Sequence, residues 1–533
     1  MGERMGRQKQ ARSLRHGVFW PPFLLVTLAL GLSFYDSPGF VAVLNRFNTS
    51  ALAILAPWFA WTGLLALVLC AVVAVSPMGS VHIGGKGARR LLQPASWCSV
   101  TLCTSTAVGI LFWAMAEPVM HYGAPPAALG IRAGTPAAAD FALSTLFLHW
   151  CFTPAALYTL PSVAFAFAFY NMKQPFSLSA PLVPLVGERG AARLSGGIDA
   201  ISLYALVAGM AASLATGVLT IAGGIAHQWG IASAPASWIA LGILVVGAFV
   251  TSAAVGLDRG VKTLSNINTV FFIALAVYVL WYGPTLSTFF LGLSGVQEYA
   301  ATFVEKSLFL KFEASDAWPK MWTVFYWSVW IAWAPVTAAF LGRIGVGYTV
   351  RTFVLVNVGV PAVFSLLWMW IFGGTAIALE QQGVGLGEMM RTQGAESAVY
   401  NVLGQFPFAR LMIPFFLISA FLGYVTAADS NTMAMAGMSS HGMSADSPEP
   451  KLWIKLTWGC MVGLLALVML CACGVDGIKT LSYLGGIPAL LYEIAMGVSV
   501  LWVCFQPARF DKMSEPETVQ DRKSDSLVPA PAV

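Results

Sequence analysis

The sequence predicts an all-α integral membrane protein, and two observations carry that prediction. Apolar stretches of eighteen or more residues recur along nearly the whole chain, and each is long enough to cross roughly 30 Å of hydrocarbon. The 533 residues are 58% hydrophobic and only 10% charged, whereas a soluble domain has about a quarter charged residues. No polar linker divides the chain, so we expect one integral membrane domain.

We expect about twelve transmembrane helices. The fourth and fifth are long enough to be tilted or to project beyond the bilayer. The predicted spans are 18–35, 53–75, 97–122, 141–170, 198–226, 236–255, 268–292, 319–341, 350–374, 411–437, 453–474 and 480–504.

The distribution of Lys and Arg predicts the orientation. If the N-terminus is cytoplasmic, the cytoplasmic side holds 21 of the 29 basic residues and the opposite side holds the other 8. Basic residues are enriched in cytoplasmic loops, so we expect both tails, 1–17 and 506–533, in the cytoplasm. The net charge of +5 reflects this topology and is no evidence for nucleic-acid binding.

The eight cysteines lie in or beside apolar spans, and their spacing matches no zinc or redox motif. Phosphate-cradling loops and hydrolase nucleophile motifs are absent from the sequence as well. A membrane enzyme therefore has little support, and we expect no catalytic residues and no resident cofactor.

An aromatic array in the eighth span indicates a ligand site. The segment FYWSVWIAWAP runs from Phe325 to Pro335, and its tryptophans, Trp327, Trp330 and Trp333, follow one another at three-residue spacing on one broad helical face. Aromatic faces presented together attract a quaternary ammonium group. The array therefore favours an organic cation or zwitterion as the ligand.

Two spans are predicted to lose helical regularity. The third has small residues, Ser105, Ala107 and Gly109, before a bulky run that ends in Glu117-Pro118, and the eighth is expected to break at Pro335. Transporter sites form at such breaks, and paired breaks five spans apart indicate an inverted repeat of spans 3–7 and 8–12. Close packing of small residues between helices is the alternative reading of the third span.

Several motifs resemble those of the betaine/choline/carnitine transporters: FWAMAEPVMHY, HWCFTPAALYTLPSVAFAFAFY, GLDRGVKTLSNIN, FYWSVWIAWAPVTAAFLGRIGVGYTVRTFV and VTAADSNTM. The resemblance covers about residues 15–505. It implies a transporter domain over 18–505 with a LeuT-like core made of spans 3–12. It also implies carriage of trimethylammonium compounds across the bacterial inner membrane, often by a homotrimer.

The resemblance places an aromatic box between the fourth and eighth spans. The matching positions are Trp150, Ala155, Tyr158 and Trp330, and further aromatic positions along the pathway are Phe325, Trp327 and Trp333. Independently of the family, Trp150 and Tyr158 are eight residues apart, about 80° around one helix, so both could face one cavity.

Two positions depart from the family's box. Ala155 stands where the family usually has a tryptophan, and Val329 stands where a tryptophan usually neighbours Trp330. We therefore expect a wider, less aromatic box that would admit a bulkier or less cationic solute than glycine betaine. Choline-transporting members tend to carry an aspartate at the position of Gly109, so the glycine favours a zwitterion over choline.

The resemblance also suggests a sodium site as the source of coupling. The family's site draws on the break in the third span and on a Thr-Ser pair in the tenth, which here is Thr426-Ala427. Sodium would then be held by Thr426, Ser213 and backbone carbonyls. Because one hydroxyl of the pair is missing, sodium-independent exchange stays open as the alternative.

Ionisable residues inside membrane spans indicate functional sites. Glu117, His149 and Asp429 match the family pattern and are interpreted as structural or gating groups. Glu493 stands where the family is usually apolar, and either a helix–helix hydrogen bond or a proton-linked role would explain it.

The leading functional hypothesis is secondary uptake of a betaine-type zwitterion. The rivals are a sodium-independent exchanger, a carrier of a non-quaternary amino-acid-like solute, and a transporter-like receptor.

Overall fold

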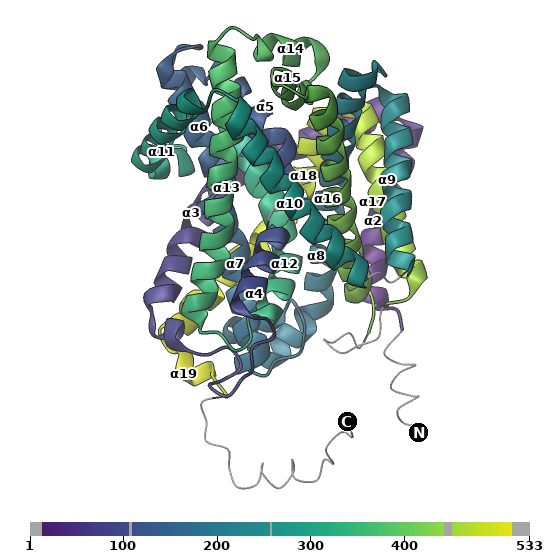
Figure 1. The fold of residues 1–533 in the computed structure, drawn as a ribbon. Coiled ribbons are helices and arrows are strands. Elements are labelled where there is room, and N and C mark those ends of the chain that lie inside the picture. Colours follow the sequence, from purple (N-terminus) through teal and green to yellow (C-terminus); the bar gives the residue numbers. More distant parts are fainter. Residues whose placement is uncertain (1–12, 106–108, 256–257, 442–449, 514–533) are drawn as a thin grey trace, which may run out of the picture.

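The computed structural model describes residues 13–105, 109–255, 258–441 and 450–513. Every regular element in these ranges is a helix, and β pairing is limited to two isolated bridges, Leu14 with Ser440 and His82 with Thr349. Figure 1 shows the helices as one bundle, with most of them running along its long axis. A helix satisfies its backbone hydrogen bonds internally, which hydrocarbon requires. The all-α prediction is confirmed.

Within the described ranges, ten helices are long and apolar enough to cross a membrane, and two bent pairs bring the number to twelve when each pair is one span. The segments that correspond to the twelve predicted spans are α2 (His16–Tyr35), α3 (Ser37–Val75), α4 (Pro94–Ser105) with α5 (Gly109–Gly123), α6 (Pro136–Trp150) with α7 (Phe152–Ala166), α8 (Val183–Trp229), α9 (Pro235–Val255), α10 (Asp258–Tyr282), α12 (Phe325–Ile344), α13 (Val350–Gln381), α16 (Ala409–Met438), α17 (Leu452–Cys473) and α18 (Val475–Cys504).

The helix ends follow from local residues. The side chain of Thr135 caps α6 by accepting a hydrogen bond from the Ala138 N–H, and Pro136 occupies the first turn, where its missing N–H costs nothing. Gly230 ends α8 in the left-handed conformation, with φ of 72°, which glycine adopts without strain.

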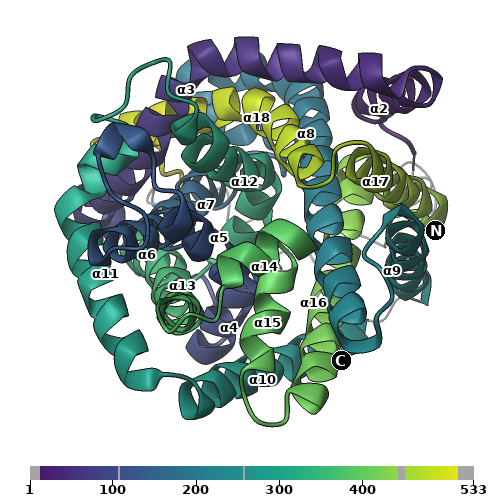
Figure 2. The same ribbon diagram turned by 90° about the horizontal axis from the view of Figure 1, so that it is seen from above.

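The seventh predicted span, 268–292, is wrong at its C-terminal end. The helix α10 stops at Tyr282, and α11 (Thr285–Ser307) leaves it at an angle of 110°. Gly283 and Pro284 stand at the corner, and proline cannot continue the helix before it. Seen from above, α11 follows the rim of the bundle past α6 and α13 (Figure 2).

The two predicted breaks have different outcomes. The axes of α4 and α5 meet at 58°, so the third span is bent as expected; Ala107 lies outside the described residues. The eighth span does not break at Pro335, because α12 continues through this residue to Ile344. Its irregularity comes earlier, in a π-helical turn at η5 (Lys320–Val324). Packed membrane helices tolerate proline because neighbouring groups satisfy the freed carbonyl.

Small residues let the central helices approach closely. In Figure 2, α12 is surrounded by α7, α8 and α18. A Cβ atom added to Gly486 of α18 would lie 2.5 Å from the Cα of Ser328 in α12, and one on Gly485 would lie 2.9 Å from the carbonyl oxygen of Ala205 in α8. Without a strong hydrophobic force between helices in lipid, such close backbone packing holds the bundle together.

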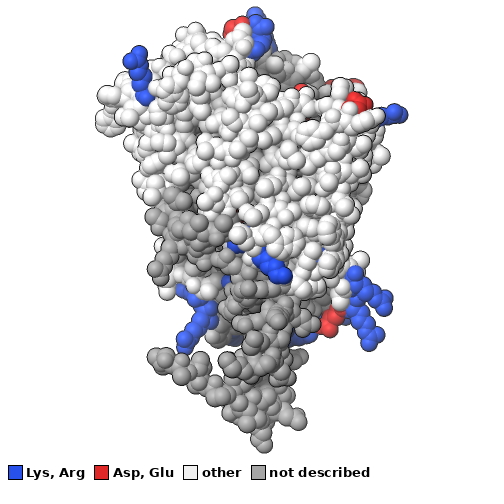
Figure 3. All heavy atoms as spheres, turned by 90° about the vertical axis from the view of Figure 1, so that its right-hand side faces the viewer, with Lys and Arg blue, Asp and Glu red and all other residues white. Residues whose placement is uncertain are grey.

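The charged surface agrees with a membrane position. Figure 3 shows that Lys, Arg, Asp and Glu gather toward the two ends of the visible face and leave a broad uncharged band between them. Large apolar side chains such as Leu28, Ile54 and Leu491 are more than half exposed, as expected of residues that face lipid.

Gly486→Ala should destabilise the bundle by roughly 1–3 kcal/mol, because the added methyl group would overlap the α12 backbone. The measurement is the Tm of the purified protein in detergent. Gly196→Ala is the matched control, since no atom lies within 4 Å of its added Cβ. An unchanged Tm for Gly486→Ala would contradict the close contact.

Candidate functional site

Three of the predicted box residues meet in the middle of the bundle. Trp330 of α12 lies edge-to-face with Trp150 of α6, with ring centroids 5.4 Å apart, and edge-to-face with Tyr158 of α7 at 5.6 Å. All three side chains are at least 95% buried. Because Trp330 touches both other rings, it occupies the space between them in this conformation. We call Trp150, Tyr158 and Trp330 the aromatic box.

A break in the fourth span positions the box. Cys151 has non-helical φ and ψ of −103° and −105°, so α6 ends at Trp150 and α7 begins at Phe152. Trp150 and Tyr158 therefore do not share one continuous helix, in contrast to the sequence-based expectation. The carbonyl of His149, near the end of α6, is available to a partner outside the helix, and it accepts the indole N–H of Trp330 at 3.0 Å.

The other box indole is held by a buried carboxylate. The Trp150 N–H donates to Oε2 of Glu117 at 3.0 Å, and the Tyr326 hydroxyl donates to the same oxygen. Oε1 lies 2.6 Å from Nδ1 of His149 and 3.5 Å from Nε2 of His121. The bonds to Trp150, Tyr326 and His149 engage both oxygens of Glu117, so we assign the group as a hydrogen-bonded network.

The remaining members of the tryptophan array have other neighbours. Trp327 packs against α3, where a Cβ atom on Gly63 would lie 2.9 Å from its indole nitrogen, and Trp333 packs in the same way against Gly209 of α8 at 2.8 Å. Residues three apart on a helix differ by about 60° in direction and residues six apart by about 120°. For this reason the array does not present one common face to a ligand.

The other predicted positions border the box or its outer side. Phe325 contacts Trp113 and is the first residue of α12, directly after η5. Ala155 is buried in α7, and Val329 is half-buried on α12. At Gly109, a Cβ atom would lie 3.2 Å from the Trp150 ring. A side chain at this position would therefore stand directly against the box.

A large cavity of about 1740 Å³ leads from the box to one end of the molecule. Tyr158 and Trp333 contribute aromatic surface to its inner part. Its outer part is lined by the α7–α8 connection (173–180) and by Arg15 and Lys512, close to the two ends of the described chain. The polar residues that line it include Ser105, Ser213, Thr337, Thr426 and Asp429. The cavity thus opens toward the face where both described ends lie.

The opposite side of the box is closed by aromatic packing. The Trp113 ring lies 5.9 Å from Trp322, 5.8 Å from Phe325 and 6.0 Å from Tyr326. The ammonium group of Lys479 lies 4.7 Å above the Trp322 ring. Trp113, Trp322, Phe325 and Tyr326 form what we call the aromatic lid.

Thr426 and Ser213, the predicted sodium ligands, both border the large cavity. Thr426 donates its hydroxyl proton to the carbonyl of Leu422 at 2.7 Å. Ser105, at the edge of the bent third span, also borders the cavity, and its hydroxyl is buried with no partner among the described residues. Thr426, Ser213 and Ser105 thus each carry a hydroxyl oxygen, the kind of ligand that a hard cation takes, at the wall of one cavity.

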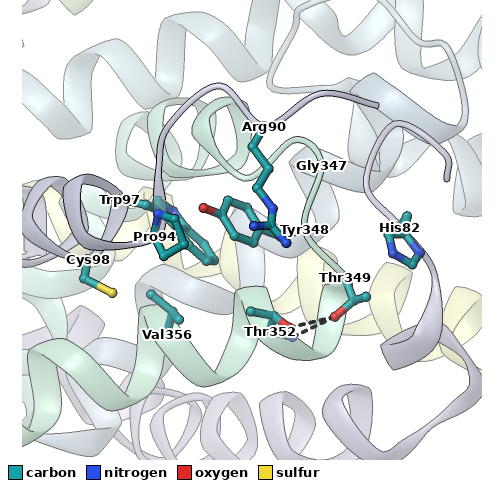
Figure 4. Close-up of a pocket in the computed structure, with 10 residues that line it drawn as sticks. All are labelled: His82, Arg90, Pro94, Trp97, Cys98, Gly347, Tyr348, Thr349, Thr352 and Val356. Carbon is teal, nitrogen blue, oxygen red and sulfur yellow. Dashed lines mark hydrogen bonds between the residues drawn. The ribbon is translucent and has the colours of Figure 1, made fainter. Parts of the chain in front are cut away.

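A second cavity, of about 270 Å³, shares no residue with the box. Figure 4 shows it between the start of α4 and the link from α12 to α13. Trp97 stacks on Tyr348 at 4.0 Å, and the guanidinium of Arg90 lies 4.8 Å above the Tyr348 ring. The cation and the aromatic faces here already engage one another, so this cavity is the weaker candidate for a ligand site.

Sequence reasoning missed His121, Thr323 and Tyr326 as partners of the box. It singled out Glu117 and His149 separately as ionisable residues in the membrane, but it could not show that they bond to each other. The four-residue spacing of Glu117 and His121, which places both on one face of a helix, was the available signal.

A bundle of membrane-spanning helices around a cavity that ends at bent helices and an aromatic box is the architecture of a membrane transporter. Residues 17–507 match the profile of the betaine/carnitine/choline family of transporters, and the chain belongs to this family. Its members are transporters and not enzymes.

Three relatives illustrate the similarity. The probable glycine betaine transporter of Desulfitobacterium hafniense is 28% identical over 84% of this chain and 90% of its own. Glycine betaine transporter 1 of Vibrio parahaemolyticus is 30% identical over 83% of this chain and 84% of its own. The ectoine/hydroxyectoine transporter of Virgibacillus pantothenticus is 29% identical over 83% of this chain and 87% of its own.

A cysteine introduced at Thr426 should react with a water-soluble maleimide applied to the face that carries the chain ends, because Thr426 borders the open cavity. The background is a variant with all eight native cysteines replaced by serine. Ser328→Cys in the same background is the control, since residue 328 is fully buried between α12 and α18. Equal labelling of the two positions would contradict the cavity.

Proposed function

We propose that the protein is a secondary active transporter that imports a betaine-type zwitterion or a related quaternary ammonium compound. The observation that carries this proposal is the meeting of Trp150, Tyr158 and Trp330, of which Tyr158 also lines the large cavity. Residues 18–505 would form the transporting unit in a bacterial cytoplasmic membrane, as a homotrimer, with tails 1–17 and 506–533 on the cytoplasmic side.

The box would bind the trimethylammonium head through its ring faces. Both indole N–H groups are engaged, by Glu117 and by the His149 carbonyl, so these hydrogen bonds use the ring edges and not the π faces. Trp330 must move away from Trp150 or Tyr158 to make room for the head. Each face then contributes up to about 2 kcal/mol in a desolvated site.

The two sides of the box would open in turn. In the present conformation the cavity reaches the face with the chain ends, while the aromatic lid covers the other side. Alternating access requires a second conformation in which the lid opens and the cavity closes. With both ends in the cytoplasm, the conformation described here is the inward-open one.

Residues around the box favour a zwitterion. Gly109 brings no charge against Trp150, so the site lacks the fixed anion that a purely cationic substrate would prefer at this position. Ala155 and Val329 provide less aromatic surface than a full box, which favours a bulkier head. A carrier of a non-quaternary amino-acid-like solute is the second candidate, and these same two positions motivate it.

Sodium is the proposed coupling ion, held by Thr426, Ser213 and nearby carbonyls. The support is that both hydroxyls border one cavity with the box residue Tyr158. Ala427 supplies no hydroxyl beside Thr426, so sodium-independent exchange is the alternative that the experiment on coupling must decide.

Trp330→Leu should abolish measurable binding of glycine betaine, carnitine and choline while the protein remains folded. The change removes the ring that contacts both other box residues. Binding is measured by calorimetry on purified protein and transport by radiolabelled flux into proteoliposomes, which also separates a transporter from a receptor. Trp281→Leu is the control, because Trp281 is 80% exposed at the end of α10. Unchanged affinity of Trp330→Leu would move the site elsewhere.

Replacing sodium by potassium should suppress uptake by proteoliposomes, because it removes the proposed coupling ion. Thr426→Ala should reproduce that loss, because it removes one proposed ligand of the same ion. Thr457→Ala is the control, since Thr457 is a half-buried residue of α17 outside the cavity that also donates to a helix carbonyl. Full uptake in sodium-free buffer at several pH values would refute sodium coupling and favour exchange.

A further inference from the structure

The network behind the box contains a carboxylate that accepts hydrogen bonds from several elements. Oε2 of Glu117 accepts the Trp150 N–H and the Tyr326 O–H, and Oε1 faces Nδ1 of His149 at 2.6 Å. Oε2 thus accepts two donors, and Oε1 accepts a third when Nδ1 of His149 carries the imidazole hydrogen. The donor set therefore fits an ionised Glu117, which acts as an acceptor only.

The imidazole rings of two histidines adjoin this carboxylate. Nε2 of His149 lies 3.0 Å from the hydroxyl of Thr323. This hydroxyl can donate to a neutral imidazole or accept from a charged one, since a threonine O–H rotates to suit its partner. Nε2 of His121 lies 3.5 Å from Oε1 of Glu117 and has no hydrogen-bond partner among the described residues.

Both indoles of the aromatic box are tied to this network. The Trp150 N–H bonds to Glu117 and the Trp330 N–H to the backbone of His149. A charge on the network thus stands one hydrogen bond behind the ring faces. With both imidazoles neutral the three side chains carry a net charge of −1, and with one proton added they are neutral.

Two lysines lie near the network. Lys479 of α18 lies over the Trp322 ring and interacts through charge with Asp476 and Glu117. Lys306 of α11 lies over Phe141 and bonds to the hydroxyl of Ser144.

Further titratable side chains come from the elements packed against α5. Glu380 of α13 accepts backbone N–H groups of α14 (Leu386–Gln393), Glu388 pairs with Arg391, and the Tyr400 hydroxyl of α15 (Ser397–Gly404) donates to the Thr220 carbonyl. The phenols of Tyr326 and Tyr158 come from α12 and α7. Among the described residues, the imidazoles of His121 and His149 are therefore the bases that adjoin Glu117 directly.

We propose that Glu117, His121 and His149 form a proton-binding site behind the aromatic box, and that a proton in this site opposes a cationic head in the box. This inference deepens the proposed function and rests on it, because it concerns the same box. One proton passes between water and an imidazole nitrogen, and no bond to the substrate forms or breaks. The two positive charges compete for one carboxylate, so binding of either weakens binding of the other.

The site is sealed in the conformation described here. Glu117, His121 and His149 are each at most 1% exposed. The ring of Trp322, part of the aromatic lid, lies 4.4 Å from that of His121. Exchange of the proton with water therefore requires the lid to move, on the side opposite to the open cavity.

The test is calorimetric binding of glycine betaine, carnitine and choline to the purified full-length protein between pH 5.5 and 8.5. The Kd of whichever compounds bind should rise as the pH falls, by up to about tenfold per pH unit, the limit for one linked proton. In two buffers with different ionisation enthalpies, binding should release up to one proton.

His149→Gln and His121→Gln identify which imidazole holds the proton. The variant that lacks this imidazole should bind the same compound with a Kd that does not depend on pH and without proton release. His227→Gln is the matched control, since His227 lies at the far end of α8 beside Tyr400, and it should keep the pH dependence. If one histidine variant does not fold, proton release by the unmodified protein and the other variant still decide the matter.

The outcomes separate the two proposals. Failure of all three compounds to bind at any pH contradicts the proposed function. Binding of one of them with a constant Kd and no proton release overturns the proton site alone. An unchanged pH dependence in the double variant of His121 and His149 would also overturn it.

Discussion

The buried carboxylate of Glu117 is the constraint on which the centre of the molecule depends. An unpaired charge at the middle of a bilayer costs at least about 2.5–3.5 kcal/mol, so the carboxylate requires donors, and these come from α6 and α12. Satisfying one charged group thereby fixes the relative position of three helices. Two of these helices carry Trp150 and Trp330, so the geometry of the box depends on a residue that does not line it.

The spans could be predicted because hydrocarbon leaves a chain little choice. Their length and apolarity set them, and every predicted span has a helical counterpart. The predicted span 268–292 failed at its end because an apolar stretch continues past the corner at Gly283 and Pro284 into a helix that runs along the rim. Hydropathy reports the presence of apolar residues and carries no information about a change in direction. The break expected at Pro335 failed because neighbouring helices can stabilise a helix through a proline.

The family pattern was enough to predict which residues of the site lie close together. Trp150, Tyr158 and Trp330 meet as expected, and Thr426 and Ser213 border one cavity. Trp327 belongs to the same array yet faces α3, because its direction on the helix differs by about 60° from that of Trp330. Tyr326 escaped notice because its bond to Glu117 joins two helices, which the order of residues along one helix does not reveal. His121 lies four residues after Glu117 in the same helix, so its spacing was a signal that the sequence did offer.

The contact between the box rings bears on how selective the site can be. Each edge-to-face pair contributes about 0.5–1.5 kcal/mol, and a head that enters between Trp330 and its neighbours must disrupt at least one such pair. A cationic head offsets the loss, because each desolvated ring face attracts it by up to about 2 kcal/mol. A neutral group of the same size gains only dispersion contacts, which do not replace the energy of the disrupted edge-to-face pair. In the proposed function, the closed box would therefore discriminate by charge before any residue contacts the rest of the solute, and Ala155 and Val329 would then select among cationic heads by size.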